Sequence, residues 1–102
     1  MLTGIDHLMI CVPDLPAACA QYAKLGFNVA PGGQHPGKGT HNAIAFNDAD
    51  YIELLAVHDV SEYTRGRGPS ARGLDLPAFI AAGGGIRYVA VRSDDLVADV
   101  AA

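Results

Sequence analysis

Two polar side chains interrupt apolar, strand-like segments of this 102-residue chain, and both have the chemistry of metal ligands. Glu53 stands inside YIELLAV, where burying a lone carboxylate is costly, so it must reach water, be neutralised or meet a cation. His7 stands inside GIDHLMICVPDL, residues 4–15, in a position where an aliphatic side chain would pack better. Taken singly, a backbone-bonded strand histidine and a solvated glutamate are the ordinary interpretations. Together, imidazole and carboxylate at adjoining strand centres form half of a ligand set for a divalent metal ion.

Other histidines and arginines are weaker candidates. His35 lies in a glycine-rich loop and His41 at the start of a strand, so either could line a substrate pocket, although a solvent-exposed side chain is the ordinary interpretation. An iron dioxygenase with two histidines and one carboxylate would need another histidine besides His7. Three arginines in the segment 60–73, Arg65, Arg67 and Arg72, could pair with an anionic substrate or simply be solvated.

The loop GGQHPGKG partly matches a phosphate-binding loop. Gly32, Gly37 and Lys38 satisfy the spacing, but Gly39 stands where a magnesium-binding serine or threonine belongs. A strand-like segment, THNAIAF, follows instead of the helix that such a loop requires. The sequence therefore does not predict a nucleotide site. We interpret the segment as a loop between two strands, which could close over a cavity.

The elements that must position His7 and Glu53 follow the order β-α-β-β-β. Residues 4–12 read as a strand and 13–26 as a helix, which Asp14 caps and Gly26 ends, with Pro16 in its first turn. A short strand over 27–30 leads into a loop over 31–39. Strands over 40–48 and 50–59 follow, joined by a tight turn. In the helix, the predicted buried stripe is Leu15, Cys19, Tyr22 and Leu25.

The end of the chain repeats its beginning. GIRYVAVRSDDL, residues 85–96, matches residues 4–15 after a shift of 81 positions and carries Tyr88 where His7 stood. Between the two copies we expect a surface loop with some helical turns over 60–73 and a short glycine-ended helix over 74–85. We therefore divide the chain into a first module, 1–59, a connection, 60–84, and the beginning of a second module, 85–102. This pattern is typical of a fragment or of a half-protein completed by a partner.

Composition excludes several classes of protein. Half of the residues are hydrophobic and 18% are charged, which is typical of a folded domain and not of a disordered chain. A net charge of −4 without a basic tract argues against nucleic-acid binding, and no apolar run reaches membrane-spanning length. Neither a secretory signal nor a disulfide pattern is apparent, so we expect a cytoplasmic protein in which Cys11 and Cys19 are reduced and buried.

The segment HLMICVPDL, a helix ending in LGF and the later YIELLAV resemble the first βαβββ module of the vicinal oxygen chelate superfamily, in particular its glyoxalase-like members. The resemblance covers about residues 4–59, and 85–102 resembles the beginning of a second module. It implies an α+β fold of the glyoxalase, bleomycin-resistance and dihydroxybiphenyl-dioxygenase type. Two such modules pair in that superfamily around a metal-centred cavity.

The resemblance places the family's metal ligands on His7 and Glu53 and gives Glu53 the catalytic role. It implies a metal-dependent lyase, isomerase or dioxygenase acting on a small oxygenated substrate. The cofactor would be a divalent ion (Zn, Ni, Mn, Fe or Co) or absent. Tyr88 departs from the pattern of a second ligating histidine, so a symmetric homodimer or a further segment must complete the site. The alternative is a metal-free protein of the same fold that sequesters an antibiotic or another small molecule.

Overall fold

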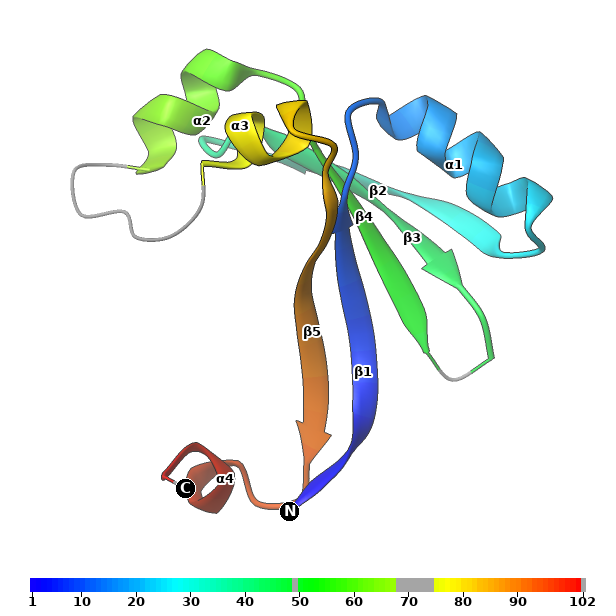
Figure 1. Cartoon of the computed structure of the whole chain (residues 1–102), viewed down its shortest axis with the longest axis vertical. Helices are drawn as coiled ribbons and strands as arrows, with labels where there is room; N and C mark the ends of the chain where they lie inside the picture. The colour runs from blue at the N-terminus through cyan, green and yellow to red at the C-terminus, as the bar shows by residue number, and fades with distance from the viewer. Residues whose placement is uncertain (49, 68–74, 102) are drawn as a thin grey trace.

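The computed structural model describes residues 1–48, 50–67 and 75–101, which form one five-stranded sheet with four helices (Figure 1). The elements in chain order are β1 (Leu2–Cys11), α1 (Leu15–Lys24), β2 (Asn28–His35), β3 (Thr40–Phe46), β4 (Tyr51–Val57), α2 (Val60–Arg67), α3 (Leu76–Ala81), β5 (Gly85–Ser93) and α4 (Leu96–Ala101). None of the helices in the described part of the chain is both long enough and apolar enough to span a membrane.

The sheet has the order β2-β3-β4-β1-β5, with β1 parallel to β4 and every other neighbouring pair antiparallel. The core lies between one face of this sheet and α1, where Leu15 and Ala18 of the helix pack on Ala43, Leu54 and Ala56. The predicted α+β class and the order β-α-β-β-β are therefore confirmed. Because α1 takes up one face of the sheet, the other face remains for a site.

Local sequence explains how α1 begins. The Asp14 carboxylate accepts a hydrogen bond from the Ala17 N–H at 3.0 Å, and a proline occupies the first turn. The helix ends before Gly26, whose φ of 102° favours glycine. Leu25, however, is 73% exposed and does not belong to the buried stripe, because the chain leaves the helix at this residue. Ala18 occupies the core in its place.

Strand β2 is longer than the sequence predicts, since the expected loop over 31–39 is strand as far as His35. The pairing with β3 slips between Pro31 and Gln34, so the two intervening glycines bulge out of register. A Cβ atom on Gly32 would lie 1.9 Å from Asn42 Oδ1, so only glycine fits there. Gly32 and Gly33, which made this segment resemble a loop in the sequence, lie in the bulge of a continuous strand.

The connection after β4 is more helical than predicted. Residues 60–67, expected to be a surface loop with some helical turns, form α2, and Asp59 Oδ1 accepts a hydrogen bond from the Glu62 N–H at its start. Asp75 caps α3 in the same way through the Ala78 N–H. The Tyr63 hydroxyl accepts a hydrogen bond from the Leu76 N–H at 3.2 Å, which ties α3 to α2.

Strands β1 and β5 form a long antiparallel pair, drawn in dark blue and orange in Figure 1. Leu8 lies directly opposite Val89, which stands 81 positions after it in the chain. The repeat-related residues therefore meet at a local twofold axis perpendicular to the sheet. A rotation about this axis exchanges β1 and β5 but leaves each side chain on the same face of the sheet. Tyr88 therefore points to the same side of the sheet as His7.

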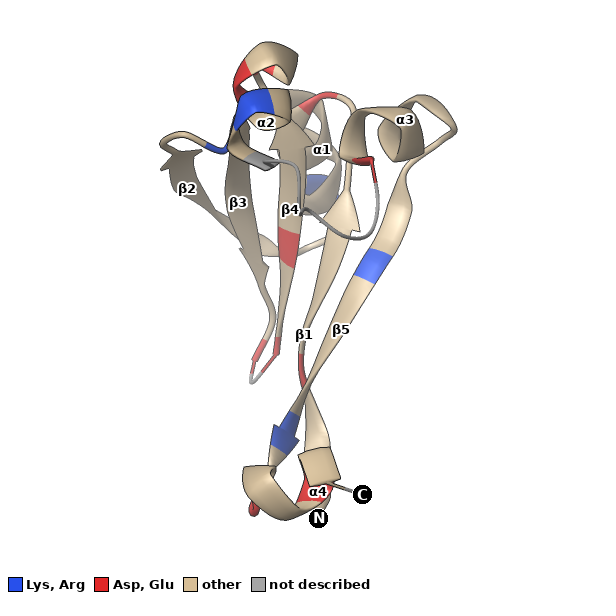
Figure 2. Cartoon of the chain, turned by 90° about the vertical axis from the view of Figure 1, so that its left-hand side faces the viewer, with Lys and Arg blue, Asp and Glu red and all other residues tan. Residues whose placement is uncertain are grey.

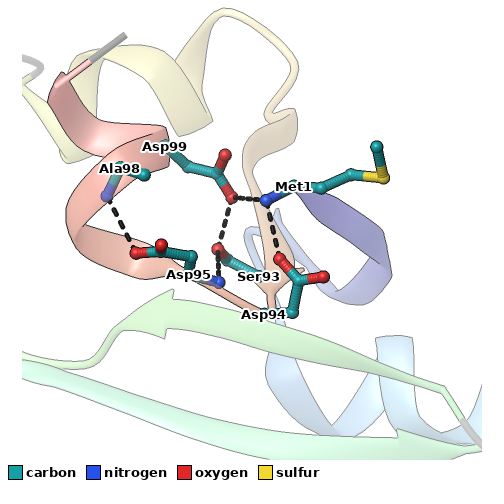
Figure 3. Close-up of polar contacts among 6 residues, drawn as sticks. All are labelled: Met1, Ser93, Asp94, Asp95, Ala98 and Asp99. Atoms are coloured by element: carbon teal, nitrogen blue, oxygen red, sulfur yellow. Dashed lines mark hydrogen bonds and ion pairs between the residues drawn. The ribbon is translucent and has the colours of Figure 1, made fainter.

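The far end of this strand pair is held by the chain terminus (Figure 3). The Met1 amino group lies 2.7 Å from Asp94 Oδ1 and 3.0 Å from Asp99 Oδ2. Asp99 also accepts a hydrogen bond from the Ser93 hydroxyl. These contacts connect the beginning of β1 to the residues that follow β5 and to α4.

Candidate functional site

His7 and Glu53 lie on the same face of the sheet, the face opposite α1. His7 pairs with Tyr51 across β1 and β4, and the two rings stack with centroids 4.5 Å apart. Glu53 follows Tyr51 by two residues and pairs with Met9, which follows His7 by two. Because side chains alternate along a strand, all four point to one side. The intervening Leu54 is buried under α1 on the other side.

Glu53 lies in a cavity of about 340 Å³ on this face. All five strands, the β2–β3 turn, α2 and α3 contribute to its walls, which are formed by Met9, His35, Lys38, Thr40, Glu53, Leu55, Tyr63, Gly66, Leu76 and Tyr88. Glu53 is the one charged residue of β4, visible as an isolated acidic band in Figure 2. Among its described lining residues, Glu53 is the one carboxylate and Lys38 the one ammonium group, and most of the others are apolar or aromatic.

Asn42 holds this carboxylate in place. Its side-chain Nδ2 donates a hydrogen bond to Glu53 Oε2 at 3.1 Å, and its Oδ1 accepts one from the Gly33 N–H at 3.1 Å. The β2 bulge therefore orients Asn42, and Asn42 orients Glu53. No hydrogen bond to Glu53 Oε1 is found within the described ranges, so this oxygen can face a ligand.

His35, a candidate pocket residue in the sequence, contributes to the wall of the same cavity from the end of β2 and not from a loop. Its Nδ1 lies 2.7 Å from the hydroxyl of the buried Thr40. This contact orients the imidazole ring through Nδ1, and Nε2 is the ring nitrogen that does not take part in it. His35 is thus a half-buried polar residue of the cavity wall, next to Thr40.

His7 has a different environment, a second hollow of about 240 Å³ formed with Phe27, Asp50 and Tyr51 among others. Its Nδ1 lies 2.8 Å from Asp6 Oδ1, and its side chain is 22% exposed. The pairing between β1 and β5 slips between Ile5 and His7, which disturbs the strict alternation at Asp6. The hydrogen bond with His7, followed by one from Arg92, lowers the pKa of the Asp6 carboxyl.

The Asp6–His7 arrangement is the one that orients a ligating histidine. When Nδ1 donates to a carboxylate, Nε2 becomes the free and more basic nitrogen, and its direction is fixed. Glu53 is similarly fixed by Asn42 with one oxygen free. Across residues 1–48, 50–67 and 75–101, however, no three or more His, Cys, Asp or Glu side chains gather as a metal site. One chain therefore offers two suitable donors and not a complete set.

His41 is not brought to either hollow. It pairs with Ala56, a residue of the α1-side core, and therefore points away from Glu53. Its ring meets that of His58 edge to face, with centroids 5.3 Å apart. Burial, with smaller contributions from His58 and His35, lowers the pKa of His41. Arg65 is not among the described residues that line the Glu53 cavity, and the side chain of Arg67 lies outside the described part of the structure. The candidate Arg72 lies outside the described residues.

Three side chains that matter here were missed in the sequence. Asn42 had a signal, since a tight turn predicted between the strands at 40–48 and 50–59 implies their pairing. In that pairing Ile44 lies opposite Glu53, and Asn42, two residues before Ile44, points to the same face. Tyr63 and Leu76 had no local signal. They reach the cavity because α2 and α3 fold back over the sheet, which is a matter of tertiary packing.

Comparison with known proteins agrees with this fold. The sequence profile of the glyoxalase-like domain matches residues 5–102. This match confirms the resemblance to glyoxalase-like members of the vicinal oxygen chelate superfamily. Among curated proteins, none matches the sequence.

Several solved structures share the architecture. Methylmalonyl-CoA epimerase from Mycobacterium tuberculosis is 28% identical with a TM-score of 0.67, and the match covers 95% of this chain and 59% of the epimerase. A variant of the Streptomyces coelicolor methylmalonyl-CoA epimerase, in complex with 2-nitronate-propionyl-CoA, is 27% identical with a TM-score of 0.67, covering 99% of this chain and 69% of that one. Hypothetical protein BH1468 from Bacillus halodurans, 19% identical with a TM-score of 0.69 over 95% of this chain and 63% of its own, shares the fold. The chain thus spans a little over half the length of the M. tuberculosis epimerase.

Proposed function

This chain belongs to the glyoxalase-like domain family, and on that premise we propose that it supplies half of an active site that moves a proton on a small oxygenated substrate. The observation that carries the proposal is Glu53: a carboxylate in a mainly apolar cavity, oriented by Asn42 through one oxygen and free at the other. A carboxylate in such a place can take a proton from a substrate carbon and return it. Glu53 is the catalytic residue in this proposal.

Isomerisation or a related lyase reaction fits this chemistry better than dioxygenation. An isomerase or lyase needs one positioned base next to a carbonyl compound, which Glu53 provides. The similarity to epimerases supports the same choice, since an epimerase inverts one stereocentre. Acyl thioesters of the kind that the similar epimerases bind belong to the substrate class to be tried, together with smaller carbonyl compounds.

His7 and Glu53 would hold a divalent metal ion, and the donor chemistry of both fits one. Asp6 directs the free nitrogen of His7, and Asn42 directs the free oxygen of Glu53. When bound, such an ion acts as a Lewis acid toward neighbouring substrate oxygens. The chain's own residues do the rest: Glu53 would leave the ion to take up the proton through the same free oxygen, and Met9, Leu55 and Leu76 give the cavity apolar walls.

We further propose that a second copy completes the site in a homodimer. His7 and Glu53 share one face of the sheet, and residues 1–48, 50–67 and 75–101 hold no group of three or more metal-ligating side chains, so further ligands must come from outside these residues. In a symmetric dimer of this chain, two His7 and two Glu53 side chains would form a four-ligand set. One ion would then serve two chains.

Metal analysis of protein purified without chelator tests the proposal. We expect about 0.5 equivalents of one divalent metal per chain, as one four-ligand ion shared by two chains requires, and a loss of most of it in His7→Ala and in Glu53→Gln. His58→Ala is the matched control, because its imidazole contacts His41 on the other side of the sheet. Metal content below about 0.1 equivalents, or equal in Glu53→Gln and the parent, would contradict the metal site.

The alternative is a metal-free binding protein, and the position of Tyr88 favours it. Tyr88 lines the Glu53 cavity in the place that repeats His7, and its ring can stack on an aromatic ligand. Thermal-shift measurements separate the two functions. Stabilisation by divalent metals supports the enzyme, whereas stabilisation by aromatic ligands with no response to metals supports the binding protein.

A further inference from the structure

We propose that Lys38 makes the Glu53 cavity selective for substrates that carry a negatively charged group, an inference that rests on the proposed function of this cavity. Lys38 is the one Lys or Arg among the described residues that line the cavity. Glu53 and Lys38 lie on different walls, one in the middle of β4 and the other in the turn between β2 and β3.

The turn that carries Lys38 is fixed by glycines. Gly37 and Gly39 flank the lysine with φ of 79° and 70°, a region in which other residues are strained. A Cβ on Gly39 would lie 2.3 Å from the Asp59 carbonyl oxygen, and one on Gly66 would lie 2.1 Å from the Gly37 carbonyl oxygen. The turn and α2 therefore pack backbone against backbone, which only glycine permits.

Hydrogen bonds hold the same turn on α2 and on the end of β4. The Gly39 N–H donates to Glu62 Oε1 at 3.0 Å, and the Gly39 carbonyl accepts from the backbone N–H groups of His58 and Asp59. The Lys38 N–H donates to the His35 carbonyl at 3.0 Å. The backbone of Lys38 is thus anchored from both sides beside the cavity, although its long side chain is exposed at the rim.

The Lys38 ammonium group is available for a ligand. It takes part in no ion pair in the described parts of the chain, whereas Arg92 pairs with Asp6 and Asp50. The Arg87 guanidinium, on β5, lies over the ring of Tyr88, 4.8 Å from its centroid, and Arg87 is not among the described lining residues. A cation on one wall and a base on another suit a carbonyl substrate that carries both an anionic group and an acidic C–H bond.

A lysine ammonium is a compact point charge that donates hydrogen bonds to carboxylate and phosphate oxygens alike. The shared chemistry is therefore a small anionic carbonyl compound. Acetoacetate represents a carboxylate and 2-oxopropylphosphonate a phosphate-like group. Acetoacetamide keeps the shape of acetoacetate without the charge.

NMR titration of metal-stripped protein in chelator tests the inference through binding alone. We expect the parent to bind acetoacetate or the phosphonate about three- to tenfold more tightly than acetoacetamide, the range of a charged contact at an exposed rim. Lys38→Met should abolish this preference and Lys38→Arg should keep it. Lys24→Met is the matched control, because Lys24 is the only other lysine and lies exposed on α1.

The outcomes separate this inference from the proposed function. A charge preference that survives in Lys38→Met, or is lost equally in Lys24→Met, would overturn it, as would binding of none of the three compounds at the cavity. Loss of preference in Lys38→Met alone supports it, even where metal analysis contradicts the proposed metal site. The relative affinities of acetoacetate and the phosphonate then decide which anionic group the cavity prefers.

Discussion

Replacing Gly32 by alanine should disturb Glu53 through Asn42, although Gly32 itself does not line the cavity. The new Cβ would lie 1.9 Å from Asn42 Oδ1 and 2.7 Å from the Asn42 carbonyl oxygen, so Asn42 must move. Its move breaks two hydrogen bonds, from the Gly33 N–H to Oδ1 and from Nδ2 to Glu53. The neighbouring Gly33 is the control, because nothing lies within 4 Å of a Cβ placed there.

The magnitude follows from the two bonds. A neutral hydrogen bond contributes about 1 kcal/mol and one to a carboxylate about 1.5–3 kcal/mol, so their loss costs about 2.5–4 kcal/mol. Alanine offsets about 0.4–1 kcal/mol by restricting the unfolded chain. We expect Gly32→Ala to lower the free energy of unfolding by about 2–3 kcal/mol, and Gly33→Ala to leave it unchanged or slightly raised.

Urea denaturation of both variants measures the difference, and a double-mutant cycle tests its cause. In an Asn42→Ala background the clash with the Asn42 side chain is gone, so Gly32→Ala should cost at least about 1 kcal/mol less than in the parent. If Gly32→Ala and Gly33→Ala unfold at the same urea concentration, or if the cycle shows no coupling, the reasoning about the bulge is wrong.

Three further predictions concern the rest of the chain. Leu54→Ala should destabilise the protein by about 2–5 kcal/mol because the side chain is fully buried under α1, whereas Leu25→Ala should change the free energy of unfolding, measured in urea, by less than about 0.5 kcal/mol. Asp6 has a lowered folded-state pKa, so its contribution is present above the ordinary value of 3.8 and is lost as the pH falls through the folded value. Urea midpoints measured across that acid range should therefore fall more steeply for the parent than for Asp6→Asn, and parallel curves would contradict the Asp6–His7 contact. Burial raises the pKa of the Cys11 thiol, so iodoacetamide should label Cys19 first in native protein; equal labelling in peptide mass spectra would refute the buried position of Cys11.

Local sequence signals were sufficient for much of the fold. The Asp14 cap, the proline in the first turn and Gly26 delimit α1, and the turn over 47–50 sets the β3–β4 register. The repeat at a shift of 81 anticipated that β5 resembles β1, since both copies carry the same strand pattern. Alternation along each strand shows which neighbours share a face with His7 and with Glu53. It allows these two side chains to point to the same side of the sheet.

Other features depended on tertiary packing. Residues predicted as a loop form a strand with a bulge, because Asn42 on the neighbouring strand accepts a hydrogen bond from the Gly33 N–H. The sequence alone could not show that His35 lines the Glu53 cavity whereas His41 is not among its described lining residues. This difference depends on the pairing of β2 with β3.

By itself the sequence determined the residue types that can do chemistry and the order of the elements that carry them, because strand periodicity, caps and turns are local properties. Only the tertiary structure decided which side chains share a cavity. Lys38, Tyr63 and Leu76 meet Glu53 because α2 packs on the glycine turn and α3 is tied to α2, contacts between segments far apart in the chain. Such contacts leave no periodic trace in the sequence, since each depends on the position of a distant partner.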